Sequence, residues 1–559
     1  MQRSPADFRR TVRVWLPDLL YTVAFLLMGW KYTRGFDATF DLGLYDETNY
    51  LHRGLQLARH GMLPAPDWGP LYSAWYAVLA VLEPDPVALY YLSHRLLVTL
   101  LAVAVYGALR VYGTPHLAAA LGGFLVLLAD LNVFTWPRVT LFALLMILGS
   151  LMAAAAMRHR LVQLGTMAFA ALLAAYARPE YFVVTLWCLL GVSVWAMIYA
   201  RQERLAVALP VSARVALALM GLLGVLALVG LGLPVGGGER SMAAFRQHFS
   251  LNWVRWTGST LDPWTDHGVI IAENFGAVES ILAAAAANPQ AFARHIGDNL
   301  RGIFTTAAQL VRYDTSVVQP LWPAAPWTAR EEATVVLSVL VGGLFGWMVW
   351  RSLVQRDEPP VATEPPVAML WGVAGYLGAG LLSAVVIYPR PHYLVTIILL
   401  FVVTGAALIV RRFAVTPAAS LRRTMVVCVA LVLLTPTFAQ QHRYGQPNLA
   451  TVRALQALDL RAPVNLLEAQ GGFHVYLGDH VTFVRPVTKI QPFDRFLLEN
   501  QINLIVLSDR LRADSRLRND PEWQAFLAQA TARGWQQLPI AAPQRELLIA
   551  PELWSSPTP

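Results

Sequence analysis

Long uninterrupted apolar blocks dominate this sequence, and a bundle of membrane-spanning helices is the fold they favour. A helix needs about 20 apolar residues to cross the hydrocarbon layer of a bilayer, and Val215–Val235 carries no charge over such a length. Only 14% of the residues are charged, against about 25% in soluble domains, which argues against a large soluble enzyme. We count about eleven blocks, at approximate residues 14–33, 88–109, 115–134, 138–157, 161–177, 181–200, 213–234, 332–350, 367–388, 392–410 and 423–440.

Arginines at the ends of these blocks predict an orientation. Short cytoplasmic loops of membrane proteins are enriched in Lys and Arg, and four arginines precede the first block. With the N-terminus in the cytoplasm, every second loop is again basic, at Arg110, at Arg158 and Arg160, at Arg201 and Arg204, at Arg351 and Arg356, and at Arg411, Arg412, Arg422 and Arg423. The first block lacks a small-residue cleavage site, so we expect it to be retained as a span.

This topology divides the chain into a membrane module, residues 1–440, and an extracytoplasmic tail, residues 441–559. Two large loops, 34–87 and 236–331, lie on the same outer side as the tail. The net charge of +8 comes from arginines at block ends, so it is a topology signal, and we expect no nucleic-acid partner. Both cysteines lie inside apolar blocks, which leaves neither a disulfide framework nor a cysteine metal site.

The tail changes composition near Gln440 and is predicted to be a small soluble α/β domain. Short β-rich runs alternate with helical patterns, and no nucleotide-binding glycine motif occurs among them. The strands are expected at 464–468, 481–484, 502–508 and 546–549, and the helices at 492–500 and 520–533.

The middle outer loop contains a second helical pattern, beginning at Asn288-Pro289. Its apolar stripe is Phe292, Ile296, Leu300, Ile303 and Phe304. Such a helix fits the surface of the bilayer, and packing against a neighbouring loop or the tail explains the same stripe equally well.

Two adjacent acids, Asp46 and Glu47, begin a predicted helix in the first outer loop. Carboxylates in a first turn are stabilised by the helix dipole, so capping is one role for them. Adjacent side chains on a helix point about 100° apart, so the two acids cannot be equal members of one pocket. We expect one to face a functional site and the other to support it.

Taken in order, these features resemble the GT-C superfamily of integral-membrane glycosyltransferases. The nearest resemblance is to the bacterial family 39-like members, which include the lipid A aminoarabinose transferase and are related to protein O-mannosyltransferases. It covers most of the chain and is carried by Tyr45-Asp46-Glu47-Thr48-Asn49-Tyr50, Pro70-Leu71-Tyr72, Ala177-Arg178-Pro179-Glu180 and Tyr388-Pro389-Arg390-Pro391-His392-Tyr393.

The resemblance implies transfer of a sugar, with inversion, from a polyprenyl-phosphate carrier to an acceptor hydroxyl at the outer face of the bacterial cytoplasmic membrane. The implied partners are this lipid-linked donor, membrane lipids, and an acceptor that is a glycan, a lipid or a protein. The reaction belongs to glycan biosynthesis in the cell envelope, and the residues identify neither the sugar nor the acceptor.

Catalytic roles follow from the same resemblance. Asp46 matches the acid that takes the acceptor proton, and Glu47 matches its supporting partner. Arg390, next to His392 and Tyr393, is the leading phosphate ligand, although an arginine snorkelling to lipid headgroups would look the same. Further substrate-binding candidates are Tyr50, Asp67, Arg178 and Glu180, and the last two can instead pair to hold the site together.

Some members of the superfamily bind a divalent cation, and oxygen ligands suit Mg or Mn. The candidates here are Asp46, Asp67 and Asp130, and the sequence does not decide whether a metal binds. Where many relatives carry an acid soon after the arginine that starts the fourth span, Arg138 is followed by Val139 and Thr140.

A transporter or flippase of a lipid-linked glycan precursor is the main alternative function. Such proteins often show repeated halves and interrupted helices with charges near the membrane centre, and we see neither pattern. A ligase or acyltransferase with a catalytic histidine would also be compatible with a membrane chain of this kind, as would a scaffold that binds glycan through its tail.

Overall fold

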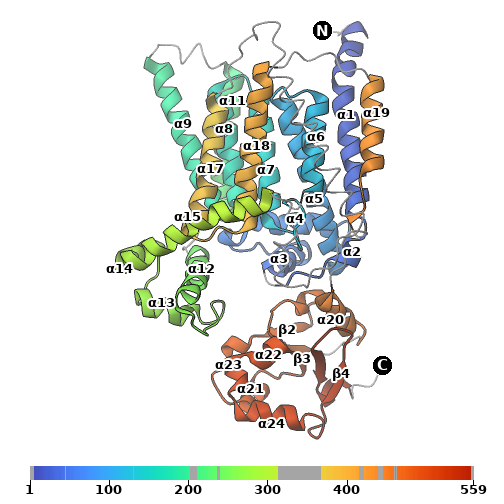
Figure 1. The fold of residues 1–559 in the computed structure, drawn as a ribbon, viewed down its shortest axis with the longest axis vertical. Helices are drawn as coiled ribbons and strands as arrows, with labels where there is room; N and C mark the ends of the chain where they lie inside the picture. The colour runs from blue at the N-terminus through green and yellow to red at the C-terminus, as the bar shows by residue number, and fades with distance from the viewer. Residues whose placement is uncertain are drawn as a thin grey trace.

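The computed structural model describes residues 5–44, 46–129, 131–201, 210–235, 239–311, 367–413, 421–438, 445–458, 460 and 463–554. It is a helical bundle with a separate α/β domain at one end (Figure 1). The helix α1 begins at the opposite end of the bundle from this domain. The predicted fold class, a polytopic helical membrane protein with a C-terminal α/β domain, is therefore confirmed.

Ten of the eleven predicted spans coincide with helices, and the block at 332–350 lies outside the described residues. The ten are α1 (Pro5–Thr33), α5 (Pro86–Val111), α6 (His116–Leu128), α7 (Val139–Ala156), α8 (Arg160–Ala175), α9 (Phe182–Arg201), α11 (Val211–Leu231), α17 (Val367–Val386), α18 (Pro391–Phe413) and α19 (Leu421–Leu434). Within the described residues, five helices are both long and apolar enough to cross a membrane, namely α5, α7, α9 preceded by a short 3₁₀ turn, α11 and α17.

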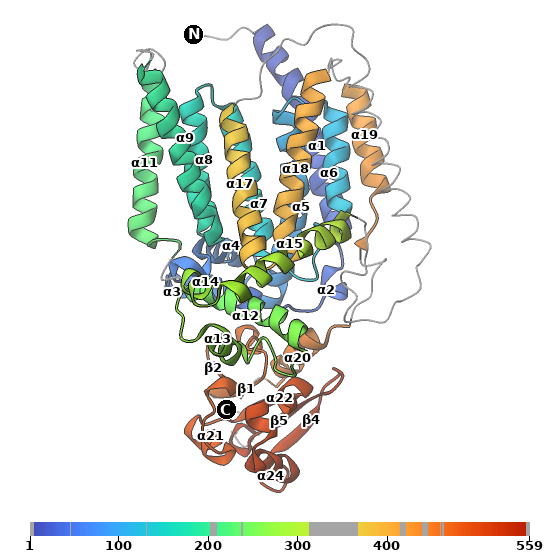
Figure 2. The ribbon, with the colours of Figure 1, turned by 60° about the vertical axis from the view of Figure 1, so that its left-hand side comes forward.

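The outward faces of the bundle are apolar, as a lipid-facing surface requires. On α11 the exposed side chains include Val215, Leu222, Leu226 and Val229, the last 79% exposed. Contiguous apolar patches of this kind are rare on soluble monomers. Figure 2 shows α11 at the edge of the bundle, where one side of it has no helical neighbour.

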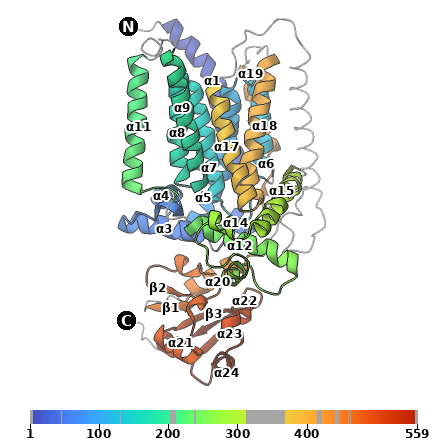
Figure 3. The same ribbon diagram turned by 90° about the vertical axis from the view of Figure 1, so that its left-hand side faces the viewer.

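A layer of helices lies between the bundle and the C-terminal domain (Figure 3). The first outer loop supplies α2 (Phe36–Thr39), α3 (Asp46–His60) and α4 (Pro70–Ala80). The middle loop supplies α12 (Glu239–Thr257), α13 (His267–Phe275), α14 (Ile281–Ala287) and α15 (Pro289–Val311). In this layer the described parts of the two loops meet the ends of the bundle helices.

The predicted helix of the middle loop is α15, and one part of its apolar stripe packs on neighbouring helices while another part is exposed. Phe292 packs on the core formed by α12 and α13, and α15 contacts α17 and α18. Leu300 and Phe304 remain exposed, at 44% and 76%.

The C-terminal domain is a five-stranded mixed sheet with the order β2-β1-β3-β5-β4. β1 pairs in parallel with β2 and β3, while β5 pairs antiparallel with β3 and β4. The strands are β1 (Val464–Leu467), β2 (Val481–Val484), β3 (Leu504–Ser508), β4 (Gln536–Pro539) and β5 (Arg545–Ile549). The helices include α20 (Pro447–Gln456), α21 (Phe493–Glu499), α22 (Asp509–Ala513), α23 (Ser515–Arg518) and α24 (Pro521–Gln529), with a 3₁₀ turn, η5 (Phe473–Tyr476).

Four of these strands and the helices α21 and α24 agree with the sequence expectations. β4 was not predicted, and α24 ends at Gln529, short of the expected residue 533. The domain boundary predicted at 440/441 falls among residues 439–444, outside the described part of the chain.

Candidate active site

A cavity of about 350 Å³ opens at the end of the bundle that faces the C-terminal domain. Segments far apart in the sequence build it: the start of α3, the residues leading into α7, the turn between α8 and α9, the starts of α12 and α14, the end of α17 and the start of α18. Its charged and polar lining consists of Asp46, Glu47, Tyr50, Arg138, Thr140, Arg178, Glu180, Arg240, Ser241, Ser383, His392 and Tyr393.

Asp46 is the first residue of α3, and its side chain is exposed in the cavity. It lies within electrostatic reach of Arg138 and Arg240. Its neighbour Glu47 is only 4% exposed. The expected division between one accessible acid and one supporting acid therefore agrees with the burial of the two side chains.

Two tyrosines of α4 hold Glu47. The hydroxyl of Tyr72 donates to Oε1 of Glu47 at 2.7 Å, and the hydroxyl of Tyr76 donates to the same oxygen. Burial raises the pKa of Glu47 to about 7, although both tyrosines and Arg138 act in the opposite direction. The carboxyl group thus stays partly protonated at neutral pH.

This raised pKa predicts a pH-dependent stability. Below pH 4.5 the side chain is protonated in both the folded and the unfolded chain, so the full stabilising contribution of Glu47 is present there. It is lost as the pH rises through about 7, and the difference between 4.5 and about 7 corresponds to on the order of 3 kcal/mol. We expect the thermal unfolding temperature in detergent to fall from pH 5 to 8 by less in Glu47→Gln than in the wild type.

The exposed residue Glu279 offers a matched control, because Glu279→Gln removes an acid outside the cavity. Its unfolding temperature should follow the wild-type pH curve. Parallel curves for the wild type and Glu47→Gln would contradict the raised pKa.

Arg178 is locked in place at the turn before α9. It is extended because it precedes Pro179, which opens the 3₁₀ turn η2 (Pro179–Tyr181). Its Nε donates to Oε1 of Glu180 at 2.5 Å, its Nη1 donates to Thr140, and its guanidinium lies 4.5 Å from the ring centroid of Tyr393. Burial alone would lower the pKa of Arg178, but Glu180 and the nearby tyrosines raise it, so this arginine is a fixed positive charge.

Arg138 stacks on aromatic rings, and it forms no ion pair with an acid among the residues that the structure describes. Its guanidinium lies 3.9 Å from the ring centroid of Trp136, and its buried Nε has no hydrogen-bond partner among the described residues. Burial and then Arg390 lower the pKa of Arg138 to about 10, which still leaves it protonated at neutral pH. Arg138 is therefore a charged donor facing the cavity.

Arg240 enters the cavity from α12. It donates to the hydroxyl of Tyr50 and lies 5.1 Å from the ring centroid of Trp68. These contacts connect the middle outer loop to α3.

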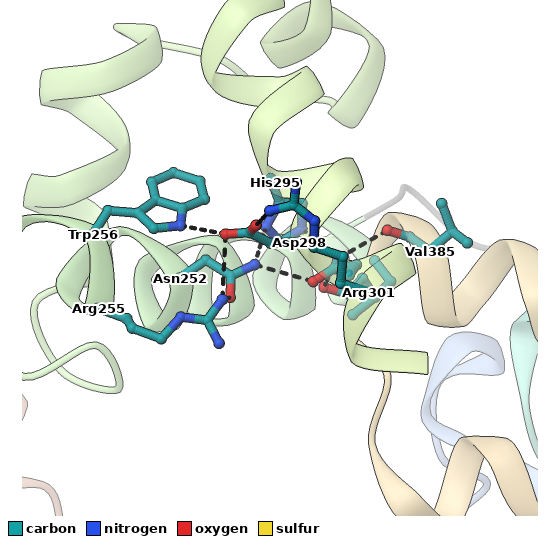
Figure 4. A network of polar contacts seen from close by, with 9 residues as sticks. Asn252, Arg255, Trp256, His295, Asp298, Arg301 and Val385 are labelled. Atoms are coloured by element: carbon teal, nitrogen blue, oxygen red, sulfur yellow. Dashed lines mark hydrogen bonds and ion pairs between the residues drawn. The ribbon is translucent and has the colours of Figure 1, made fainter. Parts of the chain in front are cut away.

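A network of polar side chains fixes α12 and α15 against the end of α17 (Figure 4). The amide of Asn252 donates to Asn299 at 3.0 Å, and Asn299 donates to the backbone carbonyl of Val385 at 2.8 Å. Asp298 accepts from the indole of Trp256 at 2.5 Å and pairs with Arg301 at 3.5 Å. Because α12 carries Arg240 and α17 forms another wall, this network sets the distance between two sides of the cavity.

The structure brings together seven of the site residues predicted from sequence: Asp46, Glu47, Tyr50, Arg178, Glu180, His392 and Tyr393. Arg390, the expected phosphate ligand, does not line the cavity; its guanidinium lies 5.1 Å from the ring centroid of Trp264 and is within electrostatic reach of Arg138. The side chain of Asp67 and the whole of Asp130 lie outside the described residues.

Sequence reasoning did not assign a site role to Arg138, Arg240, Tyr72 or Tyr76. Tyr72 belongs to the Pro-Leu-Tyr motif, and Arg138 lies at the start of a span. The sequence therefore weakly indicates a site role for both. Arg240 has no recognisable motif, and only the folded chain places it opposite Asp46.

Among the described residues, no three His, Cys, Asp or Glu side chains converge as a metal site would require.

No protein family matches the chain, and no curated protein matches it. Among solved structures, the chain is similar to ArnT from Cupriavidus metallidurans in the apo state. The TM-score is 0.38 and the sequence identity 13%, over 99% of this chain and 100% of that one.

Proposed function

We propose that this protein is an inverting membrane glycosyltransferase of the GT-C type, which moves a sugar from a polyprenyl-phosphate donor to an acceptor hydroxyl. The observation that carries the proposal is the charge pattern of the cavity. Arg138, Arg178 and Arg240 line it together with the acids Asp46 and Glu180, while burial keeps Glu47 partly protonated. Such a site attracts an anion and still keeps one exposed carboxylate as a proton acceptor.

In the proposed reaction, the acceptor oxygen attacks the anomeric carbon of the sugar as its proton passes to Asp46. The bond between that carbon and the phosphate oxygen breaks on the opposite side, which inverts the configuration. Arg138 and Arg240 stabilise the charge that develops on the departing lipid phosphate. Arg178, already neutralised by Glu180, orients the wall of the site, and Glu47 holds the start of α3 through its tyrosines.

A lipid-linked donor suits the side of the cavity that faces the bilayer. Val183 of α9 and Leu382 of α17 line the cavity, and they are also 47% and 53% exposed on the surface of the bundle. The charged site thus has an exposed apolar edge, which we propose faces the lipid. A polyprenyl chain could remain in the membrane while its phosphate reaches the arginines.

The proposed location is the bacterial cytoplasmic membrane, with the N-terminus inside and the C-terminal domain outside. The position of α1 and of the C-terminal domain at opposite ends of the bundle supports an odd number of crossings. The acceptor, whether a glycan, a lipid or a protein, would then approach from the outer side.

Mass spectrometry of lipids that co-purify with the protein tests this proposal. We expect a polyprenyl-phosphate-linked sugar in the preparation, and its loss upon incubation of proteoliposomes with the correct acceptor. Proteoliposomes could instead move a labelled polyprenyl-phosphate-linked sugar across the bilayer with the sugar still attached. That result would establish the flippase alternative. The absence of any polyprenyl-phosphate species and of any transfer would reject the proposed function.

A further inference from the structure

The segment before the proposed catalytic acid is attached to the C-terminal domain through Asp41. The two carboxylate oxygens of Asp41 accept hydrogen bonds from the backbone N–H groups of Leu449 and Asn448, at 2.8 and 2.9 Å. Both donors lie in the first turn of α20, where N–H groups have no partner inside the helix. Asp41 therefore caps α20 from a segment about 400 residues away in sequence.

Other hydrogen bonds fix the same segment from both sides. From the C-terminal domain, Asn448 donates to the carbonyl of Leu42 at 2.7 Å, and Gln446 donates to the carbonyl of Phe40 at 2.7 Å. From the bundle, the hydroxyl of Tyr90 accepts from the N–H of Gly43 at 2.8 Å. The chain just before Asp46 is thus held between α5 and α20.

A second contact touches α3 directly. Buried Glu468, 1% exposed, accepts hydrogen bonds from the N–H groups of Gln470 at 2.7 Å and Gly472 at 2.6 Å, and so shapes the loop after β1. A Cβ atom added at Gly472 would lie 2.9 Å from Cδ2 of Leu44 and 3.1 Å from Oγ1 of Thr48. The backbone of the C-terminal domain therefore packs closely on both sides of Asp46 in the sequence.

The far end of α3 is attached to the same domain. Asp479 accepts from Arg59 at 3.2 Å and lies 3.5 Å from His60. Between the two ends, the rings of His52 and His474 have centroids 5.6 Å apart. The C-terminal domain thus contacts α3 near its start, middle and end.

We propose that Asp41 is a positioning residue through which the C-terminal domain sets the place of the Asp46 carboxylate. This inference rests on the proposed catalytic role of Asp46. A shift of about 1 Å in a reacting group can cost roughly 100-fold in rate. Release of the 41–44 segment should therefore slow the chemical step while the arginines of the cavity still bind the donor.

Hydrogen exchange tests the structural half of the proposal without any substrate. In Asp41→Ala, amide exchange should rise several-fold in peptides covering 445–452 and also in those covering 46–52. Asp41→Asn, which keeps an acceptor oxygen, should give a smaller rise. A rise confined to the 445–452 peptides, with 46–52 unchanged, would overturn the proposal.

Transfer kinetics test the functional half, with the polyprenyl-phosphate-linked sugar recovered from the purified protein as donor. We expect kcat to fall about 10- to 100-fold in Asp41→Ala, with partial recovery in Asp41→Asn and a donor KM within about 2-fold of the wild type. Gly472→Ala, a change in the C-terminal domain, should also lower kcat and leave the donor KM nearly unchanged. This variant tests the proposal if Asp41→Ala does not fold. Arg495→Ala breaks an exposed ion pair elsewhere in the same domain and should behave as the wild type.

Unchanged kcat in both Asp41→Ala and Gly472→Ala would overturn the positioning role. A rise in KM without a fall in kcat would also do so, since it would place Asp41 in donor binding. A wild-type protein that transfers no sugar would count against the proposed function, and the exchange experiment would still decide whether Asp41 positions α3.

Discussion

Asp46→Asn should abolish sugar transfer while the lipid-linked donor still binds. Asn is nearly isosteric with Asp but cannot take the proton of the acceptor hydroxyl, and a positioned general base contributes roughly 10²- to 10⁴-fold to a rate. We expect kcat to fall within that range in proteoliposomes. The amount of polyprenyl-phosphate species recovered with the protein should not change, because Arg138 and Arg240, the proposed phosphate ligands, remain.

The control replaces an acid that has no part in the cavity. Glu279→Gln makes the same chemical change on the exposed surface of the middle outer loop and should keep wild-type activity. Transfer that survives intact in Asp46→Asn would exclude Asp46 as the base. Loss of both transfer and bound lipid would instead place it in donor binding or folding.

Arg138→Ala is expected to lower kcat/KM for the lipid-linked donor roughly 10- to 100-fold. A hydrogen bond to a charged group contributes about 1.5 to 3 kcal/mol, and about 1.4 kcal/mol corresponds to a factor of ten. Arg138 stacks on the ring of Trp136 and also lies within electrostatic reach of Glu47, and the two tyrosines of α4 still hold Glu47 when Arg138 is removed. Binding of a polyprenyl phosphate in detergent, measured beside the kinetics, should weaken in parallel.

Two further variants separate charge from geometry. Arg138→Lys keeps the charge but loses the planar fork of donors, so we expect only part of the activity to return. Arg390→Ala should have a smaller effect than Arg138→Ala, since Arg390 lies over Trp264 and does not line the cavity. A larger effect of Arg390→Ala than of Arg138→Ala would indicate that the phosphate binds at the turn between α17 and α18, as the sequence alone suggested.

Apolar block lengths predicted the membrane bundle well because the thickness of a bilayer fixes how long an apolar helix must be. The strands β1, β2, β3 and β5 were also predictable, since each contains a short β-branched or apolar run. β4, with the sequence Gln536-Gln-Leu-Pro539, lies at the edge of the sheet and carries no such run. Its pairing with β5 follows from tertiary contact and not from local propensity.

The site was predictable where acids and arginines belong to motifs, as Asp46, Glu47 and Arg178 do. The site was not predictable where a residue has a role only because folding brings it close to residues that are distant in the sequence. Arg240 lies in a long loop, and nothing local connects it to Tyr50, which is 190 positions earlier in the chain. The burial that raises the pKa of Glu47 likewise depends on α4 packing over α3, which no spacing within α3 reveals.

The cavity draws its walls from residues between Asp46 and Tyr393. During synthesis, the ribosome must therefore release α18 into the membrane before the pocket is complete, although the acid itself emerges among the first spans. Fragments that end before α18, whether from premature termination or from cleavage, lack one wall and are expected to be inert. A nascent chain thus carries its carboxylate through most of translation without a complete cavity around it.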